Sequence, residues 1–136
     1  MAVTMTLAYD GDLRCELKHE SQTTIQTDAP KDNEGRGEAF SPTDLVGAAL
    51  VSCAVTTMAI KGPKEGIAFP AARGRVVKEM SSTPPRKIAR LALEIEMPAG
   101  LALSARGRLE EIARTCPVAL SLSAGVVVSM DFRYPA

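Results

Sequence analysis

The sequence contains no tryptophan, and only 4% of its residues are aromatic. Proteins that bind single-stranded nucleic acid stack the bases on aromatic side chains, so no base-stacking surface is expected. Acidic and basic residues are equal in number, at 16 each, and neither kind is clustered. Because nucleic acids and anionic membranes bind concentrated basic patches, we expect neither as a partner.

The N-terminus lacks the basic leader of a signal peptide. The longest apolar stretch, Leu45 to Ile60, is interrupted by polar residues and is shorter than the ~18–20 residues that cross a membrane. Three cysteines without framework spacing are typical of a reducing compartment. We therefore expect a cytoplasmic protein whose 136 residues form one domain, 1–136.

Metal and cofactor motifs are also missing. There is no Cys-x-x-Cys, and the single histidine, His19, has no partner at ligand spacing, so we interpret it as a surface residue at a strand end. One histidine without a local signature does not indicate a cysteine protease. Residues 35–38 are glycine-rich but lack the context of a phosphate loop. With no nucleotide, haem or flavin motif, we expect no cofactor.

Hydrophobic periodicity predicts the order of the elements. Alternating apolar residues predict three strands before residue 28, and a loop follows from Asp28 to Phe40. Ser41-Pro42 starts a helix that is apolar on nearly every face, which marks a buried central helix, and Gly62-Pro63 ends it. The later elements are strands at 67–80 and 88–97, a helix at 105–115, a short helix at 117–123 and a strand at 126–134.

The three cysteines have different settings. Cys15 lies between Leu13 and Leu17 on one strand face, and we interpret it as a core residue. Cys53 has Thr57 one helical turn away, and small or hydroxyl-bearing neighbours leave room for a substrate and can donate to a thiolate. From the residues alone, core packing remains the favoured interpretation of Cys53.

Cys116 has the stronger intrinsic case for reactivity. It ends the inward face of the predicted helix at 105–115, and Pro117 makes it the N-cap of the next helix. A thiol at a helix N-terminus is expected to have a lowered pKa, which makes it reactive in exchange. Core packing is an equal alternative, and nothing in the sequence alone says that the two sulfurs meet.

The two cysteine motifs together resemble the OsmC/Ohr family of bacterial thiol peroxidases and their relatives. The matching segments are Ser41-Pro42 through Leu45, Ala48-Ala49 and Cys53, and then, 63 residues after Cys53, Cys116-Pro117. The resemblance covers essentially the full length. It implies an α+β fold with antiparallel sheets around a buried central helix, built as an intertwined homodimer with active sites at the subunit boundary.

The resemblance also implies a reaction. Cys53 would attack an organic hydroperoxide, release an alcohol and become a sulfenic acid. Cys116 would condense with it to a disulfide, which an external dithiol reduces. The alternative is a non-catalytic or redox-sensing protein that keeps the fold and binds a small apolar ligand at the dimer boundary.

One family position differs in this chain. Active members carry a glutamate directly after the proline of the helix-start motif, paired with an arginine that activates the thiolate; here that position is Thr43. The neighbouring carboxylates are Asp44 and Glu38, and the arginine is either Arg14 or Arg36. The predicted site residues are therefore Cys53, Cys116, Arg14 and Glu38.

Overall fold

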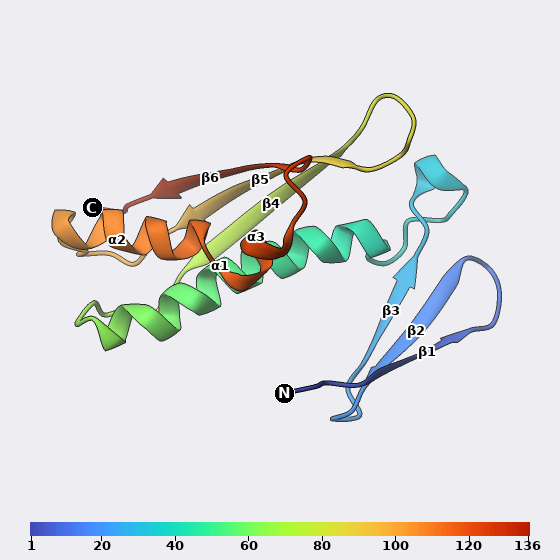
Figure 1. Cartoon of the computed structure of the whole chain (residues 1–136), viewed down its shortest axis with the longest axis horizontal. Coiled ribbons are helices and arrows are strands. Elements are labelled where there is room, and N and C mark those ends of the chain that lie inside the picture. Colours follow the sequence, from blue (N-terminus) through green and yellow to red (C-terminus); the bar gives the residue numbers. More distant parts are fainter. The chain divides into compact units, whose positions relative to one another are not determined.

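The computed structural model describes all 136 residues, and these form two compact units, residues 1–46 and 47–136. The first unit contains β1 (Met5–Tyr9), β2 (Arg14–His19), β3 (Thr24–Asp28) and the short 3-10 helix η1 (Lys31–Asn33). The strands form an antiparallel sheet in the order β1-β2-β3 (Figure 1). The prediction of three strands before residue 28 is confirmed.

The β1–β2–β3 sheet has one apolar face. Leu7 pairs with Leu17, and Leu17 pairs with Ile25, so the three apolar side chains form a row across the sheet. Met5 and Tyr9 lie on the same face because strand residues alternate in direction. Within the single chain this face is exposed, with Leu7 at 60% and Ile25 at 49%.

The loop after β3 is folded tightly against its own start. Asp28 N–H donates to the Phe40 carbonyl (3.1 Å), and Gly37 N–H donates to the Ala29 carbonyl (3.1 Å). Gly35 approaches so closely that a β-carbon there would lie 1.8 Å from the Ala29 oxygen. The loop is thus compact, and it includes the turn η1 that the sequence did not predict.

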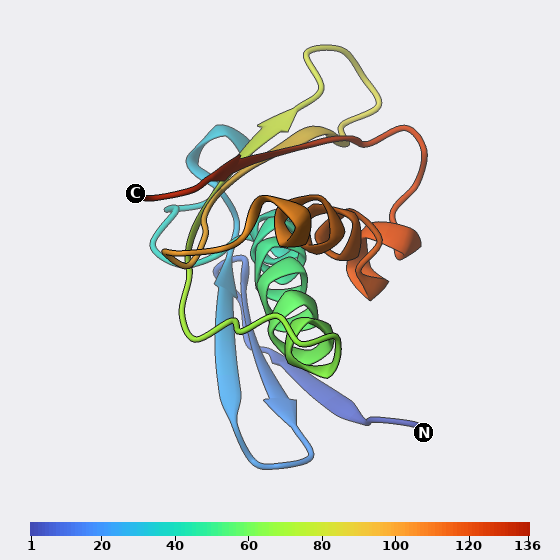
Figure 2. The same ribbon diagram turned by 90° about the vertical axis from the view of Figure 1, so that its left-hand side faces the viewer.

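The second unit packs helices against a sheet. Helix α1 (Pro42–Lys64) enters it from the first unit, and β4 (Arg73–Met80), β5 (Ile88–Glu96), α2 (Leu103–Arg114), α3 (Pro117–Ser121) and β6 (Val127–Arg133) follow. The sheet order is β4-β5-β6, and α1 and α2 cover the same face of it (Figures 1 and 2). The α+β class is confirmed. This second sheet is mixed rather than antiparallel, because β6 runs parallel to β5 after the α2–α3 crossover.

The core of the second unit lies between this sheet and the two helices. Leu91, Leu93 and Ile95 alternate along β5 and are at most 1% exposed. Leu50 on α1 and Leu109 on α2 are fully buried opposite the sheet. The inward face predicted for α2 is confirmed, and it ends at Cys116 as expected.

Helix α1 begins as the sequence predicts. Asp44 N–H donates to Ser41 Oγ (3.1 Å), and Ser41 N–H donates to Asp44 Oδ2 (2.9 Å), which is a capping box. The predicted end at Gly62-Pro63 is wrong. The residue that takes the left-handed conformation is Gly66 (φ +78°), so the helix continues through Pro63 to Lys64.

In the single chain, α1 is buried along one stripe rather than on every face. The stripe comprises Gly47, Leu50, Ala54, Thr57, Met58 and Gly62. Ile60, outside the stripe, is 53% exposed. Helix α1, with 23 residues, is longer than the apolar stretch at 45–60, and it is long and apolar enough to cross a membrane by length and composition alone. The core helix of a soluble protein meets the same criterion.

Candidate thiol site

Cys53 lies on α1 at the edge of the buried stripe. Leu50 and Ala54, its neighbours on that stripe, are fully buried, whereas Cys53 itself is partly exposed. Its sulfur lies 3.8 Å from Thr57 Oγ1, one turn further along the helix. The predicted hydroxyl partner is therefore in place, and the thiol remains reachable from solvent in the single chain.

Cys116 is the N-cap of α3, with extended backbone angles and Pro117 at the first helical position, as predicted. Its side chain is fully buried. Burial raises the pKa of the thiol above its ordinary value, and the neighbouring Cys53 side chain also raises it; backbone N–H groups of Ala119 and Val118 act in the opposite direction. The expectation of a lowered pKa is wrong, because desolvation outweighs the N-terminus of a five-residue helix.

The structure brings the two thiols together. Cys53 is one of the groups that raise the pKa of the Cys116 thiol, so the two side chains lie near each other although they are 63 residues apart in the sequence. Both are free thiols. One is partly exposed and the other fully buried, so an oxidant from solvent reaches Cys53 first. Adjacent thiols of this kind can form a disulfide after the first is oxidised.

The raised pKa of Cys116 predicts a loss of stability in mild alkali. The unfolded chain ionises this thiol from about pH 8.5, whereas the folded protein keeps its proton to a higher pH. The stabilising contribution is thus complete below about pH 8.5. It is lost as the pH rises from there to the higher pKa of the folded protein, with a slope of up to about 1.4 kcal/mol per pH unit. Urea unfolding of the reduced protein between pH 7.5 and 10 measures it. Cys116→Ser should flatten the slope, and an equal slope in both proteins would contradict the prediction.

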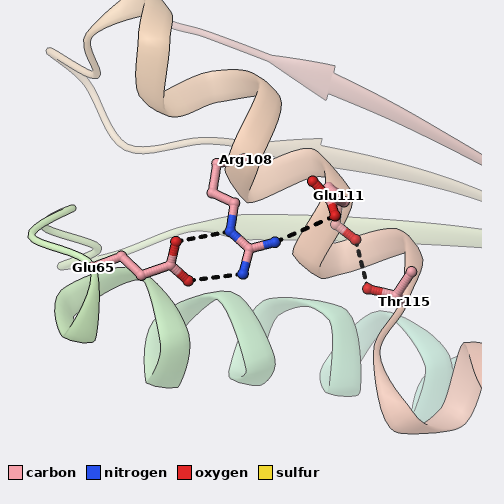
Figure 3. A network of polar contacts seen from close by, with 4 residues as sticks. All are labelled: Glu65, Arg108, Glu111 and Thr115. Atoms are coloured by element: carbon pink, nitrogen blue, oxygen red, sulfur yellow. Dashed lines mark hydrogen bonds and ion pairs between the residues drawn. The ribbon is translucent and has the colours of Figure 1, made fainter.

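A polar network connects α2 to the end of α1 (Figure 3). Arg108 donates from Nε and Nη2 to the two oxygens of Glu65 (2.8 and 2.9 Å) and lies 3.4 Å from Glu111. This bidentate bond with Arg108 holds the pKa of Glu65 below its usual range. Thr115, next to Cys116, donates from Oγ1 to the Glu111 carbonyl (2.8 Å). The network links the helix that carries Cys53 to the segment that carries Cys116.

The other two predicted site residues lie together in the first unit. Arg14 Nη2 is 3.1 Å from Glu38 Oε2, and this contact is the main cause that raises the pKa of Arg14. Arg14 Nη2 also lies 3.5 Å from Asp28 Oδ2, and Asp28 is only 1% exposed. Sequence reasoning missed Asp28, which it treated as the start of a loop. An aspartate at the end of a strand and opposite Arg14 in the hairpin register was the available signal.

The remaining candidates occupy ordinary positions. Arg36 is exposed on the loop, and Asp44 belongs to the capping box of α1. Thr43 Oγ1 lies 3.2 Å from Ser41 Oγ at the same helix start. His19 is the exposed last residue of β2 and contacts Ser21 (2.7 Å), as expected of a surface residue.

The comparisons with known proteins agree with this fold. The sequence model of the family described as OsmC-like protein matches residues 35–131. No curated protein matches the chain. A crystal structure from Psychrobacter arcticus 273-4, described as a candidate osmotic stress induced and detoxification response protein, is 34% identical, with a TM-score of 0.89 and coverage of 98% of this chain and 97% of that one.

Two more distant structures share the fold. The organic hydroperoxide resistance protein OsmC from Legionella pneumophila is 15% identical (TM-score 0.79; 98% and 97% covered). An organic hydroperoxide resistance protein from Elizabethkingia anophelis is 14% identical (TM-score 0.80; 99% and 97% covered). The match of the family model over most of the chain decides the assignment: this chain belongs to the OsmC-like protein family.

Proposed function

We propose that this chain is a thiol peroxidase that reduces organic hydroperoxides, with Cys53 as the attacking thiol and Cys116 as the resolving thiol. The observation that carries the proposal is the proximity of a partly exposed and a fully buried free thiol. Two structures with the same fold are named organic hydroperoxide resistance proteins, which supports the choice of substrate.

The proposed reaction has three balanced steps. The Cys53 thiolate attacks the distal peroxide oxygen, so the O–O bond breaks, a proton is taken up by the leaving alkoxide, and an alcohol and a Cys53 sulfenic acid form. The Cys116 thiol then attacks the sulfenic sulfur, which releases water and leaves a disulfide. An external dithiol reduces the disulfide by two exchange steps and returns both thiols.

For the pair that activates Cys53, we propose Arg14 and Glu38, as the family resemblance implies. The glutamate of the family motif is replaced by Thr43, and Glu38 supplies a carboxylate 3.1 Å from Arg14. Asp44 is the weaker choice for this role, because its Oδ2 accepts the Ser41 N–H in the capping box. We further propose that residues 1–136 act as one OsmC-like domain in the cytoplasm, consistent with a family of small soluble proteins.

Thiol loss in a single turnover tests the proposed activity. The fully reduced protein is mixed with one equivalent of cumene hydroperoxide or hydrogen peroxide, and free thiols are counted over time. We expect rapid loss of two thiols per chain, faster with the organic hydroperoxide. Loss no faster than that of free cysteine would overturn the peroxidase proposal and favour the alternative, a redox-sensing or non-catalytic protein that binds a small apolar ligand.

We also propose that the protein is a homodimer. The apolar face of the β1–β2–β3 sheet is exposed, with Met5 at 64% and Leu7 at 60%, and Ile60 on α1 is 53% exposed. Exposed apolar surface of this extent is typical of an interface, and a second copy would bury it. The native mass should then be twice the 14.4 kDa of one chain.

Leu7→Lys should shift the dimer toward monomer. A buried lysine without a partner is strongly unfavourable, so we expect dimer dissociation constants to rise by at least about tenfold. Sedimentation at several concentrations measures this. The control is Ala8→Lys, which adds the same charge on the opposite face of the strand. A monomeric wild-type protein, or equal effects of both substitutions, would contradict the prediction.

A further inference from the structure

Asp28 is a buried carboxylate at the end of β3. Its side chain is 1% exposed, and it lies directly opposite Arg14 in the β2–β3 pairing. A carboxylate removed from water is stable only if its charge is compensated. Arg14 Nη2, 3.5 Å from Asp28 Oδ2, provides that charge. The other oxygen, Oδ1, is buried and has no hydrogen-bond partner in the protein, so the contacts through Oδ2 carry the compensation.

The same oxygen of Asp28 also holds the loop. Glu38 N–H donates to Asp28 Oδ2 (3.0 Å), and Asp28 N–H donates to the Phe40 carbonyl (3.1 Å). These bonds fix the main chain of Glu38 where its side chain reaches Arg14 Nη2 at 3.1 Å. Asp28 therefore contacts both members of the Arg14–Glu38 pair: the guanidinium of Arg14 and the backbone N–H of Glu38.

Glu38 and Asp28 act on Arg14 in different ways: Glu38 mainly raises its pKa, and Asp28 fixes its position. Glu38 is the larger cause of the raised pKa of Arg14, but its side chain is 57% exposed. An exposed ion pair constrains its partners weakly, because water competes for both groups and the side chain can rotate. Asp28 is shorter, buried and bonded through its own backbone, so it can fix a position. Glu38 contributes most to the raised pKa of Arg14, whereas Asp28 is a negatively charged partner that is fixed in position.

We propose that Asp28 is a positioning residue that orients the Arg14 guanidinium and the Glu38 main chain, and so presents this pair in one fixed arrangement. The inference rests on the proposed function, in which Arg14 and Glu38 activate Cys53. Thr43 stands at the helix-start position where the family has a carboxylate. In this chain the buried Asp28 forms the ion pair with Arg14 instead.

Side-chain NMR of Arg14 tests the positioning directly. In the wild-type protein, Arg14 Nε–H should exchange slowly with water and show restricted rotation of the guanidinium. Asp28→Asn, which keeps an acceptor for Glu38 N–H but removes the charge, should speed exchange roughly tenfold. Asp12→Asn is the matched control, because Asp12 acts on Arg14 through charge alone. Equal exchange in Asp28→Asn and wild type would overturn the inference.

A second variant keeps the test decisive if Asp28→Asn folds poorly. Glu38→Gln changes an exposed side chain and leaves Asp28 intact, so Arg14 should keep most of its restricted motion. Loss of that restriction in Glu38→Gln would show that Glu38, not Asp28, holds the arginine, and would overturn the proposal.

Peroxide kinetics then separate positioning from a general effect on the fold. Asp28→Asn should lower kcat/KM about tenfold in the wild-type background, yet change it less than about twofold in Arg14→Gln, because Asp28 acts through Arg14. Equal losses in both backgrounds would overturn the inference. A wild-type protein without peroxidase activity would sink the proposed function instead, and the NMR result would still decide the role of Asp28.

Discussion

Cys53→Ser should abolish rapid consumption of organic hydroperoxide by the reduced protein. A serine hydroxyl is not ionised at neutral pH and is a poor nucleophile toward peroxide oxygen, so we expect the single-turnover rate to fall by on the order of a thousandfold or more. The substitution replaces a partly exposed sulfur by an oxygen, and the neighbouring Thr57 hydroxyl remains as a partner. Stopped-flow mixing with cumene hydroperoxide measures the rate.

Cys116→Ser should give a different result. The first step does not use Cys116, so one thiol should still be lost rapidly, and the reaction should stop at a Cys53 sulfenic acid that dimedone traps. Mass spectrometry identifies the adduct. Because position 116 carries no thiol in this variant, the adduct should map to Cys53.

Cys15→Ser is the control for both variants. Cys15 lies on β2 in the first unit and is the remaining free thiol, so its replacement should leave the reaction unchanged. Rapid peroxide consumption by Cys53→Ser, or full loss of two thiols in Cys116→Ser, would contradict the assignment of roles. Loss of activity in Cys15→Ser would point to a third sulfur in the reaction.

Gly35→Ala should disrupt the loop that carries Glu38. A β-carbon at Gly35 would lie 1.8 Å from the Ala29 oxygen and 2.2 Å from its carbonyl carbon, and backbone atoms cannot move aside as a side chain can. The loop would have to open, with loss of bonds such as Glu38 N–H to Asp28 (3.0 Å). We expect unfolding to become easier by about 2–3 kcal/mol, measured by urea denaturation.

Gly107→Ala is the matched control, with the opposite expected sign. Gly107 lies within α2, and a β-carbon there meets nothing within 4 Å. Alanine favours the helix over glycine by about 0.8–1 kcal/mol, so this variant should be more stable than the wild type. The pair of variants makes the same chemical change at two sites. Equal stability of Gly35→Ala and the wild type would show that the loop adapts, and would contradict the prediction.

Local features of this protein follow from its sequence. The helix start at Ser41-Pro42, the inward face of α2 and the placement of Cys116 before Pro117 each depend on residues a few positions apart, and all three are confirmed. The family resemblance also came from local motifs around Cys53 and Cys116. Local hydrogen bonding and helix periodicity determine these features, so a short window of residues is sufficient to predict them.

Other features were decided by the tertiary structure. The pKa of Cys116 depends on its burial, which outweighs the helix N-terminus that the sequence displays. The parallel pairing of β6 with β5 depends on the path of the α2–α3 crossover, and the end of α1 depends on which glycine becomes left-handed. The role of Asp28 is the clearest case. Its burial, and its contacts with Arg14 and Glu38, arise from strand pairing and loop closure. The residues next to Asp28 in the sequence do not reveal that its carboxylate is removed from water.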